Sequence, residues 1–236
     1  MNSETRRIKR FYKATSVAAE GNRYAVLLDD RRASTALRNV LSAPNAALAQ
    51  AVADEWAAQD EHIIRTSMPL TGMLSVVIDA DDAAIEEWRE EIVAYLKSDL
   101  VCYRAETPTA LVSRQSEEWD PFLDWLRREC AVNLKVTAGI VSVEQPDEAA
   151  QAITEMLKYE MPETIFAVKL ATTLAGSAVL ALALWKKAFA PQHIFEASRL
   201  DERFQEERWG VDQDAKDREE HLLTEFLAIG QFLSLL

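Results

Sequence analysis

Residues 165–184 read IFAVKLATTLAGSAVLALAL, twenty positions with a single charge at Lys169. The run is long enough to cross a bilayer, but it is rich in Ala, Thr, Gly and Ser rather than in large apolar residues. An apolar helix that does not span a membrane has to be buried on all sides by other helices. We therefore expect one long helix to begin at Pro162 and to lie at the centre of a helical bundle. A peripheral membrane protein that uses this segment is the minor alternative.

Helical patterns lie on both sides of this run. Apolar residues recur at helical spacing between positions 85 and 96, and again between 120 and 130, where Asp120-Pro121 predicts a helix start. Pro191 predicts the start of a polar helix, and a last helix is expected from about 212 to 235. The second part of the chain is therefore predicted to be mainly α-helical, like an orthogonal bundle.

The first part of the chain has the patterns of strands. Two extended runs, residues 10–18 and 23–28, flank a Gly21-Asn22 turn signal and predict a β-hairpin, with a third short strand near 34–37. Ser42 as N-cap and Pro44 in the first turn predict a helix start.

The predicted fold class is therefore α+β. We expect a small β-rich α+β domain over residues 1–80 and a helical domain over residues 81–236.

Composition limits the classes of partner. The chain has 236 residues, of which 49% are hydrophobic and 28% charged, which is typical of a globular protein. Its net charge of −13 disfavours nucleic acid and anionic membrane surfaces as partners. The charge is uneven, because residues 1–32 hold eight basic and four acidic side chains, whereas residues 196–225 hold five basic and eleven acidic ones. The acidic stretch predicts a solvated helix face that could meet a basic partner.

No pattern predicts an enzyme, a cofactor or a metal. The three histidines (His62, His193 and His221) are far apart, and no Gly-rich phosphate loop is present. Carboxylate pairs such as Glu86-Glu87 are typical of solvated helix faces. An enzyme with an unrecognised carboxylate site is the alternative that these observations leave open.

The compartment is predicted from the cysteines and the first residues. Cys102 and Cys130 are too few and too far apart for a disulfide framework, so both are expected to be reduced. Residues 1–10 are polar and basic, without the apolar core of an export signal. We expect a cytoplasmic protein, and, because no coiled-coil heptad is present, a monomer when free.

Several stretches, taken in order and at their spacing, carry a resemblance to a known family. They are Arg10-Phe11-Tyr12-Lys13, Val26-Leu27-Leu28-Asp29 with Arg31, Ala53-Asp54-Glu55-Trp56-Ala57-Ala58-Gln59, Met68-Pro69-Leu70-Thr71, Ser98-Asp99-Leu100-Val101-Cys102-Tyr103-Arg104-Ala105, Gln115, Trp119-Asp120-Pro121, Leu174-Ala175-Gly176-Ser177, and Ser198-Arg199-Leu200-Asp201-Glu202-Arg203-Phe204-Gln205 followed by Trp209-Gly210. Together they resemble the ATP12 family, the assembly chaperones of the F1 sector of ATP synthase.

The resemblance implies a function and a fold. Members of this family bind the unassembled α subunit of F1, shield it from aggregation and yield it to the β subunit. The implied fold is a small α+β domain followed by a helical one. Mitochondrial members carry a presequence, whereas this chain begins almost at the first of these stretches, so a bacterial cytoplasmic member is expected.

Candidate partner-binding residues lie mainly in the last of these stretches and just after it. The set is Asp201, Glu202, Gln205, Glu206, Trp209, Gly210, Asp212 and Asp214, together with Trp56 and Gln59. The carboxylates are expected to pair with Arg or Lys of the partner. Trp56 lies on an apolar stripe typical of a core, and Trp209 is either a buried anchor between two helices or an exposed binding anchor. Gly210 is expected to end its helix in the left-handed αL conformation.

Overall fold

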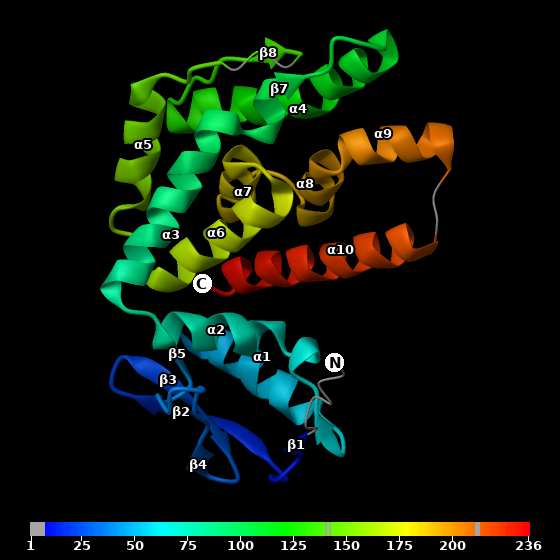
Figure 1. Cartoon of the computed structure of the whole chain (residues 1–236). Coiled ribbons are helices and arrows are strands. Elements are labelled where there is room, and N and C mark those ends of the chain that lie inside the picture. The colour runs from blue at the N-terminus through cyan, green and yellow to red at the C-terminus, as the bar shows by residue number, and fades with distance from the viewer. Residues whose placement is uncertain (1–7, 140, 142, 211–212) are drawn as a thin grey trace. The chain divides into compact units, whose positions relative to one another are not determined.

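The computed structural model describes residues 8–139, 141, 143–210 and 213–236. The chain divides into two compact units, Met1–Asp81 with Leu235–Leu236 (unit 1) and Asp82–Ser234 (unit 2). Strands lie mainly in unit 1, and unit 2 is helical (Figure 1). The prediction of a mixed α+β fold is confirmed.

Unit 1 is built on a small antiparallel sheet. Strands β2 (Thr15–Glu20) and β3 (Arg23–Leu28) form the predicted hairpin, in register from Thr15 opposite Leu28 to Glu20 opposite Arg23. Gly21 takes φ of 61° in the turn, a conformation that glycine adopts without steric cost. The other edge of β3 pairs with β4 (Arg31–Arg32) and β5 (Ser42–Ala43).

The predicted third strand at 34–37 is wrong in its position. Asp29 and Asp30 both have positive φ, 48° and 64°, so the chain reverses within two residues and β4 begins at Arg31. Beyond it, only an isolated bridge joins Ser34 to Val40.

Helix α1 (Ala46–Ala57) packs on β2 and β3, and α2 (Pro69–Asp79) packs on α1. The prediction that Ser42 caps α1 is wrong, because Ser42 lies in β5. The cap is Asn45, whose side chain accepts a hydrogen bond from the Leu48 N–H at 2.9 Å. A second small sheet pairs β1 (Ile8–Lys9) with β6 (His62–Ile63).

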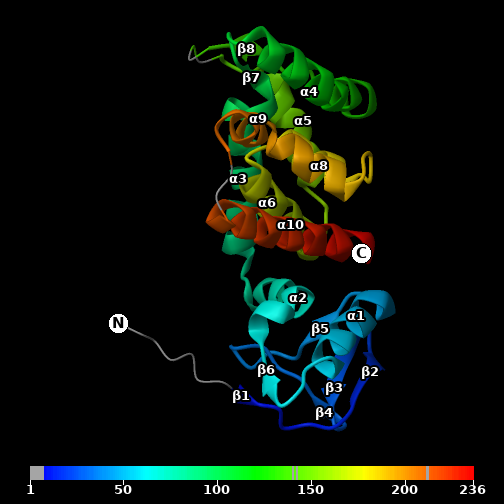
Figure 2. The same cartoon turned by 90° about the vertical axis from the view of Figure 1, so that its right-hand side faces the viewer.

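Unit 2 contains eight α-helices among its described residues. They are α3 (Asp82–Tyr95), α4 (Thr109–Cys130), α5 (Asp147–Leu157), α6 (Pro162–Ala175), α7 (Ala178–Trp185), α8 (Pro191–Ser198), α9 (Leu200–Trp209) and α10 (Gln213–Ser234). Helix α6 packs against α3, α7 and α10, and α7 also packs against α4 and α8 (Figures 1 and 2). Between α3 and α4 the chain forms two short 3-10 turns (Leu96–Ser98 and Leu100–Cys102) and β7 (Tyr103–Arg104), which pairs with β8 (Thr137–Ala138). Both cysteines are free, and Cys102 is buried.

The apolar run is two helices rather than the single predicted one. Gly176 takes φ of 66° and ends α6, and the Ser177 side chain caps α7 by accepting from the Leu180 N–H. The run is nevertheless buried among other helices, as expected: Ala178 to Leu184 are all buried. Among the helices of the described residues, none has the length and apolar character needed to cross a membrane.

The predicted helix start at Asp120-Pro121 is also wrong. Helix α4 begins at Thr109, and Pro121 lies inside it. The helix continues through the proline because its buried side chains keep helical spacing on both sides of it. These are Gln115, Trp119, Phe122, Trp125 and Leu126.

Candidate partner-binding surface

Helix α9 is polar on most of its surface. Of its ten residues only Leu200 and Phe204 are buried, and these two attach the helix to the rest of unit 2. Its last residue, Trp209, is 84% exposed. Trp209 is therefore not a buried anchor between two helices. An exposed indole at the end of a charged helix is the kind of side chain that becomes an anchor in a protein interface.

The acidic candidates on α9 are not equivalent. Glu202 forms an ion pair with Arg199 on the preceding turn at 3.0 Å. Glu206 is half-buried, and Gln205 is exposed. Asp201 is half-buried and accepts a hydrogen bond from Gln115 at 2.7 Å. The predicted cluster on α9 therefore contains one exposed amide, Gln205, two half-buried carboxylates, Glu202 and Glu206, and one carboxylate, Asp201, bonded to another helix of unit 2.

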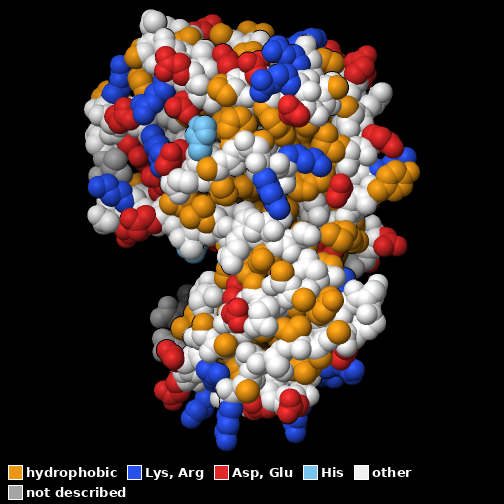
Figure 3. Space-filling view, turned by 180° about the vertical axis from the view of Figure 1, so that it is seen from behind, with side chains coloured by type: hydrophobic (Ala, Val, Ile, Leu, Met, Phe, Trp, Pro, Cys, Tyr) orange, Lys and Arg blue, Asp and Glu red, His pale blue; other side chains and the backbone are white. Residues whose placement is uncertain are grey.

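A shallow hollow of about 220 Å³ lies between α9 and α10. Its lining alternates in charge: Arg199, Glu202, Arg203, Glu206, Ala215, Arg218, Glu219 and Leu222. Across the hollow, the Arg203 Nε donates to Glu219 at 2.9 Å. Charges of both signs are also intermixed over the face of unit 2 seen in Figure 3. The excess of acidic residues predicted from the sequence is thus partly neutralised by arginines on the same two helices.

The remaining candidates of this region lie at the connection between α9 and α10. Asp214, in the first turn of α10, is exposed. Asp212 lies outside the described residues. Gly210 has φ of 86° and ψ of 163°, so the prediction of an αL conformation is wrong, although the positive φ still favours glycine.

The two candidates from unit 1 are interior residues. Gln59 is 5% exposed, and its amide bonds to the Glu55 carbonyl, the Ser67 hydroxyl and the Ile64 N–H. Trp56 is half-buried and packs edge-on against Tyr12, with ring centroids 5.7 Å apart. Trp56 and Gln59 therefore pack within unit 1, whereas the candidates on α9 and at the start of α10 belong to unit 2.

The interior of unit 2 contains a buried carboxylate. Asp99 is fully buried and accepts hydrogen bonds from the Ser177 hydroxyl at 2.6 Å and from the Val179 N–H at 3.0 Å. Burial raises the pKa of Asp99 to about 6, although these hydrogen bonds oppose the shift. The carboxylate therefore caps the start of α7 together with Ser177 and joins it to the turn after α3.

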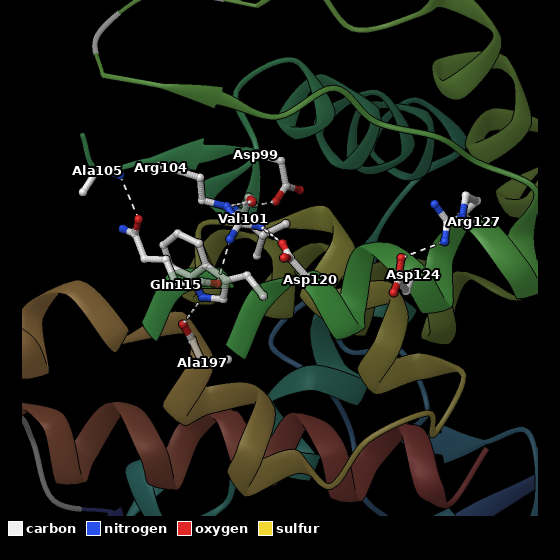
Figure 4. A network of polar contacts seen from close by, with 10 residues as sticks. Asp99, Val101, Arg104, Ala105, Gln115, Asp120, Asp124, Arg127 and Ala197 are labelled. Carbon is white, nitrogen blue, oxygen red and sulfur yellow. Dashed lines mark hydrogen bonds and ion pairs between the residues drawn. The ribbon is translucent and has the colours of Figure 1, made fainter. Parts of the chain in front are cut away.

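Next to it lies a buried arginine. The guanidinium of Arg104 donates to the carbonyls of Val101 at 2.9 Å and Gln115 at 2.7 Å, and to Asp120 at 2.8 Å (Figure 4). It also lies 5.1 Å from the centre of the Trp119 ring. Burial lowers the pKa of Arg104, and the nearby Asp120 opposes that shift. A guanidinium bonded on three sides fixes the chain between α3 and α4.

Two side chains of α4 extend this network to the C-terminal helices. Gln115 accepts from the Ala105 N–H at 2.8 Å and donates to Asp201 on α9. The indole of Trp119 donates to the Ala197 carbonyl on α8 at 2.8 Å (Figure 4). The polar interior of unit 2 therefore reaches the start of the candidate helix.

Five of the stretches that carry the family resemblance meet here. They are those around Asp99 to Ala105, Gln115, Trp119 to Pro121, Gly176-Ser177 and Ser198 to Asp201. Sequence reasoning missed this network: it placed Asp120 at a helix start and Arg104 at the end of a short strand. The available signal was an arginine directly after the apolar run Leu100-Val101-Cys102-Tyr103, whereas Gln115 lies in a polar stretch. No spacing rule pairs residues so far apart in the chain.

Among the described residues, no three His, Cys, Asp or Glu side chains come together in a way that could hold a metal ion.

Comparisons with known proteins agree with the motif analysis. The model of the ATP12 chaperone protein family matches residues 9–127. The mitochondrial protein atp12 of Schizosaccharomyces pombe is 23% identical over 96% of this chain and 82% of its own length.

Solved structures match nearly the whole chain. The crystal structure of Atp12 from Paracoccus denitrificans is 32% identical, covers 97% of this chain and 98% of its own, and has a TM-score of 0.92. A putative chaperone from Agrobacterium tumefaciens is 36% identical, covers 96% of this chain and 85% of its own, and has a TM-score of 0.91. The resemblance expected from the sequence is confirmed, and the chain belongs to the ATP12 family, the chaperones of ATP synthase assembly.

Proposed function

We propose that this protein binds the unassembled α subunit of F1 ATP synthase, shields its subunit interface and releases it to the β subunit. Family membership supports the general role of assembly chaperone. The observation that carries the binding site is Trp209, which is 84% exposed at the end of a helix that also bears the carboxylates of Glu202 and Glu206. We propose that α9 and the start of α10 form the contact surface.

The chemistry of such a surface suits a chaperone. An unassembled subunit exposes apolar surface that aggregates unless it is covered. An indole covers apolar area, and the neighbouring Glu202, Glu206 and Asp214 can pair with Arg or Lys of the α subunit. Such a mixed interface needs no nucleotide, metal or covalent step, so the protein acts by binding and not as an enzyme.

Release follows from competition. The β subunit covers the same apolar surface of α in the assembled enzyme, so it displaces the chaperone once it is present. The affinity of the chaperone for α therefore has to lie between that needed to prevent aggregation and that of the α–β interface.

The first experiment is a co-expression pull-down of the tagged protein with the α or the β subunit of its own host's F1. Selective recovery of soluble α, lost when β is added, is the expected result. If α aggregates as much with the protein as without it, the proposal fails.

Charge reversal locates the surface. Glu202→Lys and Asp214→Lys should each reduce recovery of α, whereas Glu148→Lys on α5 serves as a matched acidic control. If Glu202→Lys and Asp214→Lys both recover α fully, these two carboxylates are not part of the contact surface.

The compartment follows from the same proposal. A bacterial member of the family acts in the cytoplasm, where α is synthesised, and the mitochondrial relative named above acts in that organelle. Expression of this chain in its own host, followed by fractionation with α, tests the location.

A further inference from the structure

The start of α9 is held by one buried amide. Gln115 on α4 is 1% exposed, and its side chain is bonded at both ends, to the Ala105 N–H at 2.8 Å and to the Asp201 carboxylate at 2.7 Å. Its backbone carbonyl accepts from Arg104, which is itself fixed by Val101 and Asp120. An amide with a donor on one side and an acceptor on the other keeps a single orientation.

Asp201 lies in the first turn of α9, where a negative charge also suits the helix dipole. Its bonded oxygen faces Gln115, as the 2.7 Å distance requires. Among the described residues, Glu202, the next residue, bonds within its own turn to Arg199. The two adjacent carboxylates of the predicted site therefore have different surroundings.

The remainder of α9 is joined to other helices by contacts that are more exposed than the buried amide of Gln115. Beyond its two buried apolar residues, the described side-chain bonds to other helices are those of Arg203 with Glu196 and Glu219, and of Glu207 with Arg114. From Asp201 to Trp209 the helix rises about 12 Å, so a tilt of about 10° at its start moves the indole by about 2 Å. The direction set at the first turn therefore contributes, together with these ion pairs, to where Trp209 is presented.

We propose that Gln115 is a positioning residue for the partner-binding helix. It sets the direction of α9 through its bond to Asp201, and Asp201 acts through this bond rather than through its charge on the partner. This inference rests on the proposed function, because the position of α9 matters only if α9 meets the α subunit.

The first test separates the bond from the charge. In Asp201→Asn the side-chain oxygen can still accept from Gln115 while the charge is lost, so affinity for isolated α should change less than about twofold. In Asp201→Ala the bond is lost, and affinity should fall at least about tenfold, in line with hydrogen bonds to charged groups. Equal losses in both variants would overturn the inference, because they would show that the charge is what matters.

A reversed pair tests the same bond from the other side. Gln115→Glu places two carboxylates together and should weaken α binding. The double variant Gln115→Glu/Asp201→Asn restores a donor and an acceptor with opposite polarity, and it should regain most of the affinity. Failure of this rescue would also overturn the inference. Gln151→Leu, an exposed glutamine on α5, is the matched control and should bind like the unmodified protein.

Hydrogen exchange gives a readout that does not need the partner. In Asp201→Ala the amides of α9 should exchange faster, while those of α6 and α7 keep their protection. Unchanged exchange in α9 would contradict the positioning role even if binding were lost. If the unmodified protein does not bind α at all, the proposed function fails, and the exchange measurement still decides whether Gln115 positions the helix.

Discussion

Helices α7 and α9 belong to the same unit, yet they are built in opposite ways. In α7 seven of the eight residues are buried, and its start is capped by Ser177 and Asp99. In α9 two of the ten residues are buried, and no side chain caps its start. Helix α7 contributes stability through the apolar area that it removes from water, whereas α9 contributes little to the core and presents Trp209 to solvent.

This difference separates two roles within one unit. Substitutions in α7 should change the free energy of unfolding, and substitutions on α9 should change partner binding.

A cavity in α7 should lower the free energy of unfolding more than any other change proposed for these two helices. Leu182 is completely buried, so Leu182→Ala should lower the free energy of unfolding by about 2–5 kcal/mol. Leu227→Ala on α10, where the leucine is 38% exposed, should cost less than about 1 kcal/mol. Urea denaturation measures both. Equal losses at the two positions would mean that α7 is not the stabilising element.

The buried carboxylate at the cap of α7 should make stability depend on pH. The pKa of Asp99 is raised from 3.8 to about 6 in the folded state, so the folded protein binds this proton more tightly than the unfolded one. The resulting stabilisation, about 3 kcal/mol, is complete below the unfolded pKa and is lost as the pH rises through about 6.

The measurement is the free energy of unfolding between about pH 4 and pH 7 for the unmodified protein and for Asp99→Asn. Other carboxyl groups contribute equally to both proteins, so the difference isolates Asp99. As the pH falls, the free energy of unfolding of the unmodified protein should rise relative to that of Asp99→Asn. A constant difference across this range would exclude the expected titration.

On α9 the effect should appear in binding alone. Trp209→Ala should weaken binding of the α subunit by about 2 kcal/mol or more, which is roughly thirtyfold, because exposed tryptophans are frequent interface anchors. The same variant should unfold within about 0.5 kcal/mol of the unmodified protein. Tyr159→Ala removes another aromatic side chain, 83% exposed between α5 and α6, and should leave binding unchanged. A stability loss at Trp209 larger than its binding loss would contradict the division of roles.

The smallest effect is expected at the far end of α9. Glu207 pairs with Arg114 of α4 at 2.8 Å, and both side chains are exposed. Glu207→Gln should change the free energy of unfolding by less than about 1 kcal/mol, and this change should shrink further at high salt. Thermal unfolding at low and high salt provides the comparison, and an effect independent of salt would point to a contact other than the ion pair.

Much of the fold could be predicted from local patterns. The hairpin followed from two β-rich runs around Gly21, and the buried apolar helices followed from a run with one charge at Lys169. These features depend on residues close together in the chain, where periodicity and turn chemistry are informative.

The errors occurred where distant residues decide the outcome. Gly176 was expected inside a helix but ends α6, and the distant Asp99 helps Ser177 to cap the next helix. Pro121 was expected at a helix start, but α4 continues past it because Trp119 and Phe122, on either side of the proline, are both buried. Tertiary contacts of this kind override local propensity.

The candidate site was predicted in part. The sequence indicated the α9 region, and the structure shows Trp209 exposed there. It did not indicate that Asp201 is bonded to Gln115, because these residues are 86 positions apart. Trp56 and Gln59 were grouped with the site through the resemblance, although the apolar stripe already indicated core packing for Trp56. The burial of Gln59 depends on its bonds to Glu55, Ser67 and Ile64, which no stripe indicates.

The network around Arg104 has a consequence for sequence variation. Its members come from distant stretches of the chain, yet each bond depends on a neighbour that is itself held by another bond. The effects of substitutions within it should therefore be strongly epistatic: a change at Gln115 alone is harmful, but it becomes tolerable once Asp201 has changed as well. Homologues that differ at one of these positions should carry a compensating difference at its bonded partner, so the network constrains pairs of residues rather than single ones.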